Sequence, residues 1–185
     1  MTITVGPQEF TFVDFDARAI SSLAAQVAAD VGLADGLDVT IEIDESTPLG
    51  RAQVTSIDSV ALAIQSGAFE EPTAPRQFSE RATADVLGRL LFRVRDRLDP
   101  DFGAPPLDEE LSMPHANAWD VYAVARLRRA GYPSQRQRRL YAFRTRHGFT
   151  DVADRAFQRL WTADDLTWSD IVALSDEAAV ATVAS

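Results

Sequence analysis

A chain of 185 residues with a hydrophobic content of 46% is long enough to form one domain of ordinary size around its own core. The absence of cysteine excludes disulfides, thiol nucleophiles and Cys-based metal sites. All 18 basic residues are arginine, and without lysine a P-loop, a protein kinase and a pyridoxal phosphate enzyme are excluded. No apolar run reaches the length of a membrane helix, and the start MTITVGPQEF lacks the features of a secretory signal. These observations predict a cytoplasmic protein without a membrane-spanning segment.

The formal net charge of −10 is distributed unevenly along the chain. Residues 121–160 contain ten arginines and two aspartates, whereas residues 1–120 contain eight arginines and 21 acidic residues. The overall negative field repels phosphate, so general affinity for nucleic acid or for a membrane surface is not expected. The arginine-rich block is a local exception to this rule.

The first 66 residues have the patterns of mixed strand and helix. TITV and EFTFVDF flank a Gly-Pro turn and predict a hairpin. A helix is expected over 16–32, ended by Gly32, because one face collects the apolar side chains of Ile20, Leu23, Ala24, Val27 and Val31. DVTIEID, residues 38–44, alternates as a half-buried strand does. RAQVTSI and SVALAIQSG, on the two sides of Asp58, predict a second hairpin.

Residues 67–78 carry two prolines and predict a loop. Ser79 suits the N-cap of a long helix over 80–98, with an apolar stripe from Val86 to Leu98 and with Arg89, Arg93 and Asp96 on the opposite side. Residues 99–114 contain four prolines and several acids, so they predict a surface loop or a boundary.

The C-terminal part predicts a series of helices. One is expected over 116–130 and another over 134–147, and glycine follows each of them, at 131 and at 148. A third helix begins after a cap at Thr150 or Asp151, and a short last helix covers TWSDIVALSDEA. Three tryptophans are expected to anchor this part by burial, because their side chains carry large apolar areas: Trp119, Trp161 and Trp168.

The stretch YPSQRQRRLYAFRTRHGF, residues 132–149, concentrates five arginines, two tyrosines and two phenylalanines. On a helix, Leu140 and Phe143 form an apolar ridge that the arginines border. One interpretation is structural: the ridge packs in the core and the arginines pair with carboxylates of the acidic first 120 residues. Another is an anion-binding surface, and a third is a protein interface rich in Arg and Tyr. The candidate ligand-binding residues are Tyr132, Arg136, Arg139, Tyr141, Arg144 and Arg146.

The two histidines, His115 and His147, are 32 residues apart and belong to no cluster with metal-ligand spacing. A metal site that joins them to Asp120 or Asp151 is therefore not expected, and no cofactor is expected. A Ser–His–Asp triad also lacks a recognisable serine motif. We expect a structural or surface role for both histidines and identify no catalytic residue.

The segments SERATADVLGRLLFRVRDRLDPDFGAPP and QRQRRLYAFRTRHGFTD resemble an uncharacterised protein family of high-GC Gram-positive bacteria. That resemblance covers most of the chain and implies no activity. The order of helix, strands and long helix is also loosely similar to the zincin-like metalloproteases, whose long helix carries HExxH. In this chain the corresponding helix contains VLGRLLFR, residues 86–93, so the likeness implies no zinc hydrolysis.

Taken together, the patterns predict an α+β fold over 1–185 as a single domain. A small antiparallel or mixed sheet with packed helices over 1–98 is followed by a loop over 99–114 and a helical part over 115–175. For function, the leading hypothesis is a non-enzymatic cytoplasmic protein that binds another protein or itself. Two alternatives stay open: an anion-, phosphate- or nucleic-acid-binding module that uses the Arg-rich 126–146 segment, and a hydrolase with a carboxylate site that the sequence does not reveal.

Overall fold

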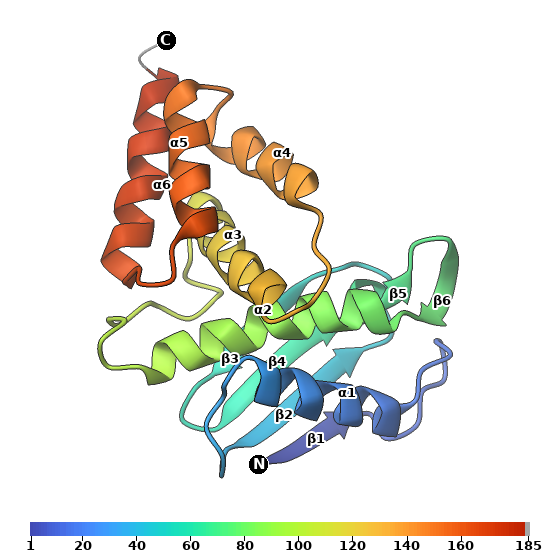
Figure 1. The fold of residues 1–185 in the computed structure, drawn as a ribbon. Helices are drawn as coiled ribbons and strands as arrows, with labels where there is room; N and C mark the ends of the chain where they lie inside the picture. The colour runs from blue at the N-terminus through green and yellow to red at the C-terminus, as the bar shows by residue number, and fades with distance from the viewer. Residues whose placement is uncertain (184–185) are drawn as a thin grey trace. The chain divides into compact units, whose positions relative to one another are not determined.

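The computed structural model describes residues 1–183, which form two compact units that meet in sequence between Leu98 and Asp99 (Figure 1). The α+β class is confirmed: a four-stranded mixed sheet, a two-stranded sheet and six α-helices are present within the described residues. Unit 1 holds all the strands, and unit 2 is helical. The expectation of one domain over 1–185 stays a prediction.

The main sheet of unit 1 contains β1 (Thr2–Gly6), β2 (Asp38–Asp44), β3 (Ala52–Ser56) and β4 (Val60–Gln65), in the order β1-β2-β4-β3. β1, β2 and β4 run parallel, and β3 runs antiparallel to β4. The expected hairpin on the two sides of Asp58 is therefore confirmed. Parallel neighbours need a crossover between them, and α1 (Ala17–Asp30) supplies it between β1 and β2.

The hairpin expected from TITV and EFTFVDF is wrong, because β1 pairs in parallel with β2 and residues 8–16 form no strand. Two of its three aromatic side chains, Phe10 and Phe15, pack in an aromatic cluster instead. Phe15 contacts the rings of Phe10, Phe69 and Phe78 at centroid distances of 5.6, 6.5 and 5.7 Å. Burial of aromatic area in this cluster explains why a β-rich composition does not produce a second strand here.

A second correction concerns residues 67–78, which were expected to form a loop. They contain the short 3-10 helix η1 (Ser66–Ala68) and the antiparallel pair of β5 (Glu70–Glu71) and β6 (Ala74–Phe78). The pair is short and irregular, since its register shifts between Glu70 and Glu71. Side-chain oxygens hold it together: Glu70 accepts a hydrogen bond from the backbone N–H of Arg76 at 2.9 Å.

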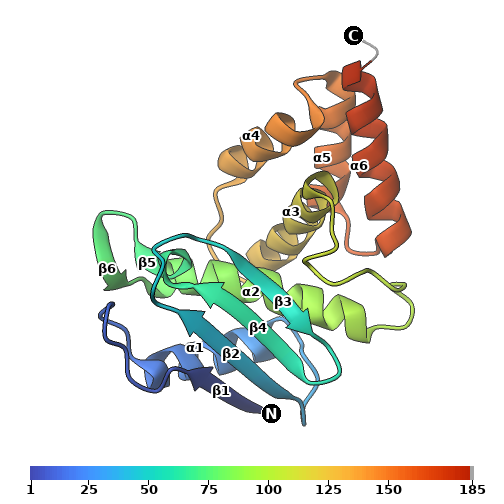
Figure 2. The ribbon, with the colours of Figure 1, turned by 180° about the vertical axis from the view of Figure 1, so that it is seen from behind.

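Both helices of unit 1 lie on one face of the main sheet, as the two opposite views show (Figures 1 and 2). They are α1 and α2 (Glu80–Leu98). The alternation along β2 fits this arrangement, because Val39, Ile41 and Ile43 are buried while Glu42 and Asp44 are exposed. The opposite face of the sheet carries no helix of unit 1.

α1 and α2 begin and end where their sequences indicate. The side chain of Asp16 caps α1, and Gly32 follows its end with φ of +72°, a conformation that favours glycine. Ser79 Oγ accepts a hydrogen bond from the N–H of Ala82 at 3.4 Å, which confirms the expected N-cap of α2. The stripe of α2 is buried up to Val94, but Arg93 and Asp96 are buried as well. Burial of α2 therefore extends beyond its apolar stripe.

Unit 2 contains α3 (Met113–Arg129), α4 (Arg136–His147), α5 (Asp151–Thr162) and α6 (Trp168–Val183). Residues 99–112 form no helix or strand, as expected. Ser112 and Thr150 cap α3 and α5, and Gly131 and Gly148 adopt positive φ just after α3 and α4. α6 is longer than the short helix that was expected. None of the helices in residues 1–183 has the length and apolar content needed to cross a lipid bilayer.

The core of unit 2 is rich in aromatic side chains. Phe102, from the irregular segment, stacks on Trp119 at 5.6 Å, and Trp119 contacts Trp168 at 5.1 Å. The N–H of Trp168 also donates a hydrogen bond to the carbonyl oxygen of Phe102 at 2.8 Å. Trp119 and Trp161 are buried and Trp168 is half-buried, so the expectation that tryptophans anchor this unit is confirmed.

Adjacent positions of β2 test the assignment of its two faces. Ile41 has no exposed surface, so Ile41→Ala should lower the free energy of unfolding by about 2–5 kcal/mol through lost burial and the cavity that remains. Thr40 lies on the face without helices, so Thr40→Ala should cost less than about 1 kcal/mol. Urea unfolding of the full chain, followed by far-UV circular dichroism, measures both changes. Equal losses would contradict the described register.

Candidate functional site

The arginine-rich stretch forms α4, which turns its apolar ridge toward the core of unit 2. Phe143 is fully buried and Leu140 is partly buried against that core. Tyr132 and Arg139 are half-buried, and Arg146 is exposed. The six candidate residues do not all converge on one point: Tyr132 precedes the helix, whereas Tyr141 and Arg144 both contact the ring of Phe149.

Arg144 makes the best-defined contact of the stretch. Its Nε donates to Asp154 Oδ1 at 2.7 Å, and its Nη2 donates to Asp154 Oδ2, so the guanidinium binds the carboxylate through both oxygens. This hydrogen bonding lowers the pKa of the Asp154 carboxyl and raises the pKa of the Arg144 guanidinium. The fork of Arg144 is already occupied by a carboxylate from α5.

Arg136 has a different partner. Its Nη2 donates to Gln158 Oε1 at 2.6 Å, and its guanidinium carbon lies 5.3 Å from the ring centre of Phe157 and 5.8 Å from that of Trp161. Both distances are within the range of cation–π contacts. Arg136 therefore ties the first turn of α4 to α5.

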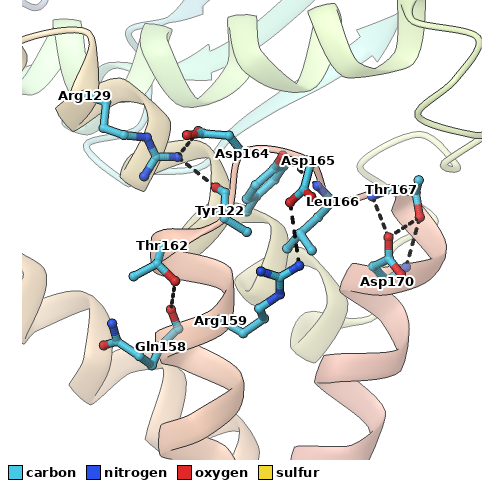
Figure 3. Close-up of polar contacts among 11 residues, drawn as sticks. Tyr122, Arg129, Gln158, Arg159, Thr162, Asp164, Asp165, Leu166, Thr167 and Asp170 are labelled. Atoms are coloured by element: carbon cyan, nitrogen blue, oxygen red, sulfur yellow. Dashed lines mark hydrogen bonds and ion pairs between the residues drawn. The ribbon is translucent and has the colours of Figure 1, made fainter.

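Two further arginines stabilise the connection between α5 and α6 (Figure 3). Arg129 donates to the carbonyl oxygens of Trp161 at 3.0 Å and Ala163 at 2.9 Å, which the end of α5 leaves without helical partners, and it also pairs with Asp164. Arg159 lies 3.6 Å from Asp165. Within the stretch 132–149, Arg144 binds Asp154, so for this arginine the expected carboxylate from the first 120 residues is wrong.

The same connection is held by a capping box (Figure 3). The N–H and Oγ1 of Thr167 both donate to Asp170 Oδ2, at 2.9 and 2.6 Å, and the N–H of Asp170 donates back to Thr167 Oγ1 at 3.3 Å. These bonds lower the pKa of the Asp170 carboxyl. The N–H of Leu166 donates to the hydroxyl oxygen of Tyr122, so the loop is fixed to α3 as well.

An aromatic pair is exposed at the end of α4. The ring centres of Tyr141 and Phe149 lie 5.9 Å apart in an edge-to-face contact, although 66% and 64% of their surfaces are exposed. The guanidinium carbon of Arg144 lies 5.9 Å from the Phe149 ring centre. We call Tyr141, Phe149 and Arg144 the aromatic patch. Phe149 was missed as a candidate because it lies past the end of the helix, where helical periodicity gives no direction.

His147 and Ser175 form a buried hydrogen-bonded pair. His147 Nδ1 lies 3.0 Å from the carbonyl oxygen of Phe143, and Nε2 lies 2.8 Å from Ser175 Oγ. A carbonyl oxygen can accept but not donate, so Nδ1 carries the proton and the serine hydroxyl donates to Nε2. A histidine that activates a serine uses the same direction, but Ser175 and His147 are 0% and 1% exposed. No substrate can reach this serine in the described conformation.

The second histidine makes an exposed contact. His115 Nε2 lies 2.7 Å from Asp176 Oδ1, and the ring lies edge-to-face against Trp168. Within the described residues, no group of three or more His, Asp and Glu side chains is placed to hold a metal ion.

Comparisons with known proteins found no family model, no curated protein and no solved structure that matches this chain. The two resemblances inferred from the sequence stay predictions. The side chains described above therefore carry what can be inferred about function.

Two neighbouring arginines test the structural use of this residue type. Arg129→Met removes the hydrogen bonds to Trp161 and Ala163 and should lower the free energy of unfolding by about 1–3 kcal/mol, since a charged donor is lost at the end of α5. Arg128 is exposed one position earlier, and Arg128→Met should change stability by less than about 0.5 kcal/mol. Urea unfolding followed by tryptophan fluorescence compares them. An equal effect would contradict the role of Arg129.

The burial of His147 predicts a pH dependence. Burial lowers the pKa of His147 below its usual value, and a charge on His115 lowers it further. The hydrogen bond to Phe143 and the negative charge of Asp176 act in the opposite direction. The unfolded chain therefore takes up the proton first as pH falls. The contribution of neutral His147 to the free energy of unfolding is fully present above about pH 6.5. It declines by up to about 1.4 kcal/mol per pH unit as the pH falls from there toward the pKa of the folded state.

His147→Gln should remove this decline, whatever its effect on stability at neutral pH. Urea midpoints of both proteins between about pH 7.5 and pH 5.5, read from tryptophan fluorescence, provide the measurement. A decline of the same slope in the variant would show that another group causes it.

Proposed function

We propose that this chain is a non-enzymatic protein that acts by binding another protein, and that the aromatic patch is its contact surface. The observation that carries the proposal is the exposed edge-to-face pair of Tyr141 and Phe149 beside a guanidinium. Single exposed apolar side chains are ordinary, but aromatic residues and arginine in mutual contact are the types enriched at the energetic centres of protein interfaces.

The partner should have an acidic contact surface. α4 contains five arginines and no acidic residue. Arg138 is exposed, lies one helical turn before Tyr141, and has no ion pair among the described residues. An apolar side chain of the partner would cover the two rings, and its carboxylates would pair with Arg138. A second copy that met the same patch about a two-fold axis would bring arginines together, which disfavours self-association through this surface.

The alternative of an anion-binding module has weaker support. Of its candidate residues, Arg144 already binds a carboxylate through both oxygens, and Arg136 is held against Gln158, Phe157 and Trp161. A phosphate would have to displace these contacts, and the net charge of −10 opposes its approach. Catalysis by the Ser175–His147 pair would require the pair to become accessible.

The test is a comparison of two double variants. Tyr141→Ser with Phe149→Ser removes the aromatic patch, whereas Phe12→Ser with Leu49→Ser removes two other exposed apolar side chains, in unit 1. Each protein is immobilised and exposed to an extract of the cells that produce it, and retained proteins are quantified by mass spectrometry. An acidic protein should be retained by the wild type and the control, should bind the patch variant at least tenfold more weakly when purified, and should dissociate as salt rises.

Two further measurements separate the alternatives. Sedimentation velocity over a range of concentrations reports self-association, and a fluorescent single-stranded oligonucleotide reports nucleic-acid binding. Retention that is equal for wild type and patch variant would overturn the proposal. So would a dimer that the patch variant loses, or oligonucleotide binding that depends on the patch.

A further inference from the structure

One face of the main sheet carries no helix of unit 1 (Figure 2). The side chains on this face surround a hollow of about 440 Å³. It lies where the parallel strands β2 and β4 end and the antiparallel strand β3 begins. Crevices at the carboxyl ends of parallel strands are a common position for ligands in open sheets. The volume falls in the range of small-molecule sites.

The register of the strands places long polar side chains around the small side chain of Ala63. Ala63 on β4 pairs with Glu42 on β2 and with Gln53 on β3, so an alanine lies between two long side chains on the same face. In the next row toward the strand ends, Asp44 pairs with Gln65, and the backbone of Arg51 exchanges hydrogen bonds with Gln65. Ala63 is therefore the floor.

The two sides of the hollow carry opposite charges that have no partner among the described residues. Neither the carboxylate of Glu42 nor the guanidinium of Arg51 makes a hydrogen bond or ion pair with any residue in 1–183, and both side chains are exposed. The carboxamide oxygen of Gln65 accepts from the N–H of Arg51 at 3.0 Å, so its NH₂ group is left to donate. One oxygen of Asp44 accepts from Ser46.

The lack of a side chain at Gly6 leaves room for the Glu42 carboxylate over β1. Gly6 on β1 pairs with Glu42, and a Cβ at Gly6 would lie 2.5 Å from Glu42 Oε2. The carboxylate therefore leans over β1, on the side of β2 away from Arg51. The strands that carry Glu42 and Arg51 are separated by two strand spacings, about 10 Å.

From this geometry we infer that the hollow binds a short peptide with free termini. The ammonium group binds Glu42 and Asp44, and the carboxylate binds Arg51. The chain between them lies over Ala63, where the carboxamides of Gln53 and Gln65 can bond its peptide groups. A free α-amino acid carries its two charges too close together to reach both sides, whereas an extended tripeptide spans them, since each residue adds about 3.3 Å.

Isothermal titration calorimetry with triglycine tests the inference on the full chain. Triglycine should bind, and the blocked forms N-acetyltriglycine and triglycine amide should each bind at least tenfold more weakly, because each lacks one terminal charge. Glycine should not bind measurably at the same concentration. 6-Aminohexanoate has separated charges but no peptide groups, and equal binding of this compound would overturn the assignment to peptides.

Variants locate the site and guard against binding elsewhere. Arg51→Gln should reduce triglycine affinity at least tenfold and abolish the difference between triglycine and its amide. Glu42→Gln should also reduce triglycine affinity at least tenfold, and should abolish the difference between triglycine and N-acetyltriglycine. Arg18→Gln and Glu9→Gln, at exposed positions outside the hollow, are the matched controls and should bind as the wild type does.

Ala63→Leu fills the floor and should also abolish binding, but this change could disturb the sheet. The charge variants at exposed positions keep the test valid in that case. Absence of heat with triglycine, or equal affinity in wild type, Arg51→Gln and Glu42→Gln, would overturn the inference. It is independent of the proposed protein-binding function, because that function uses residues of unit 2.

Discussion

Parallel pairing of β1, β2 and β4 is the constraint on which unit 1 depends. Parallel neighbours cannot be joined by a tight turn, so the chain must cross over the sheet through α1 before β2 begins. With α1 and α2 on the same face, the other face of the sheet carries no helix of unit 1. The same pairing brings the ends of β2 and β4 together. The polar hollow is thus a consequence of how the strands are connected.

Unit 2 depends instead on the planar guanidinium group. Short helices leave many carbonyl groups and charges at their ends, and arginine can satisfy several of them at once. Arg129 binds carbonyl groups at the end of α5, and Arg144 binds the carboxylate of Asp154 in the first turn of the same helix. Arg136 lies against aromatic rings of α5. The positive block of the sequence is therefore largely used inside the unit. Tyr141 and Phe149 of the aromatic patch stay exposed, as do Arg138 and Arg146.

The helices and the β3–β4 hairpin could be predicted from the sequence, because capping residues, helix-ending glycines and the alternation of apolar and polar residues depend only on residues close together in the chain. Ser79, Gly32 and Gly148 are examples. Pairing between strands distant in the sequence has no comparable local signal. The parallel pairing of β1 with β2 was therefore not predicted, and EFTFVDF was wrongly expected to be the partner strand of β1. The burial of Arg93 and Asp96 also depends on packing that periodicity cannot express. The hollow was not predicted for the same reason, because Glu42, Arg51 and Ala63 come together only through the pairing register of three strands.

Gly6 and Glu42 place a joint restriction on how this sequence can vary. A Cβ at position 6 would lie 2.5 Å from Glu42 Oε2, so a side chain there requires the flexible end of Glu42 to rotate away from β1. A relative with a larger residue at 6 therefore needs a redirected or shorter side chain at 42, which would change where the negative charge of the hollow lies. Covariation of these two positions among relatives would then separate sequences that retain the hollow from those that keep only the fold.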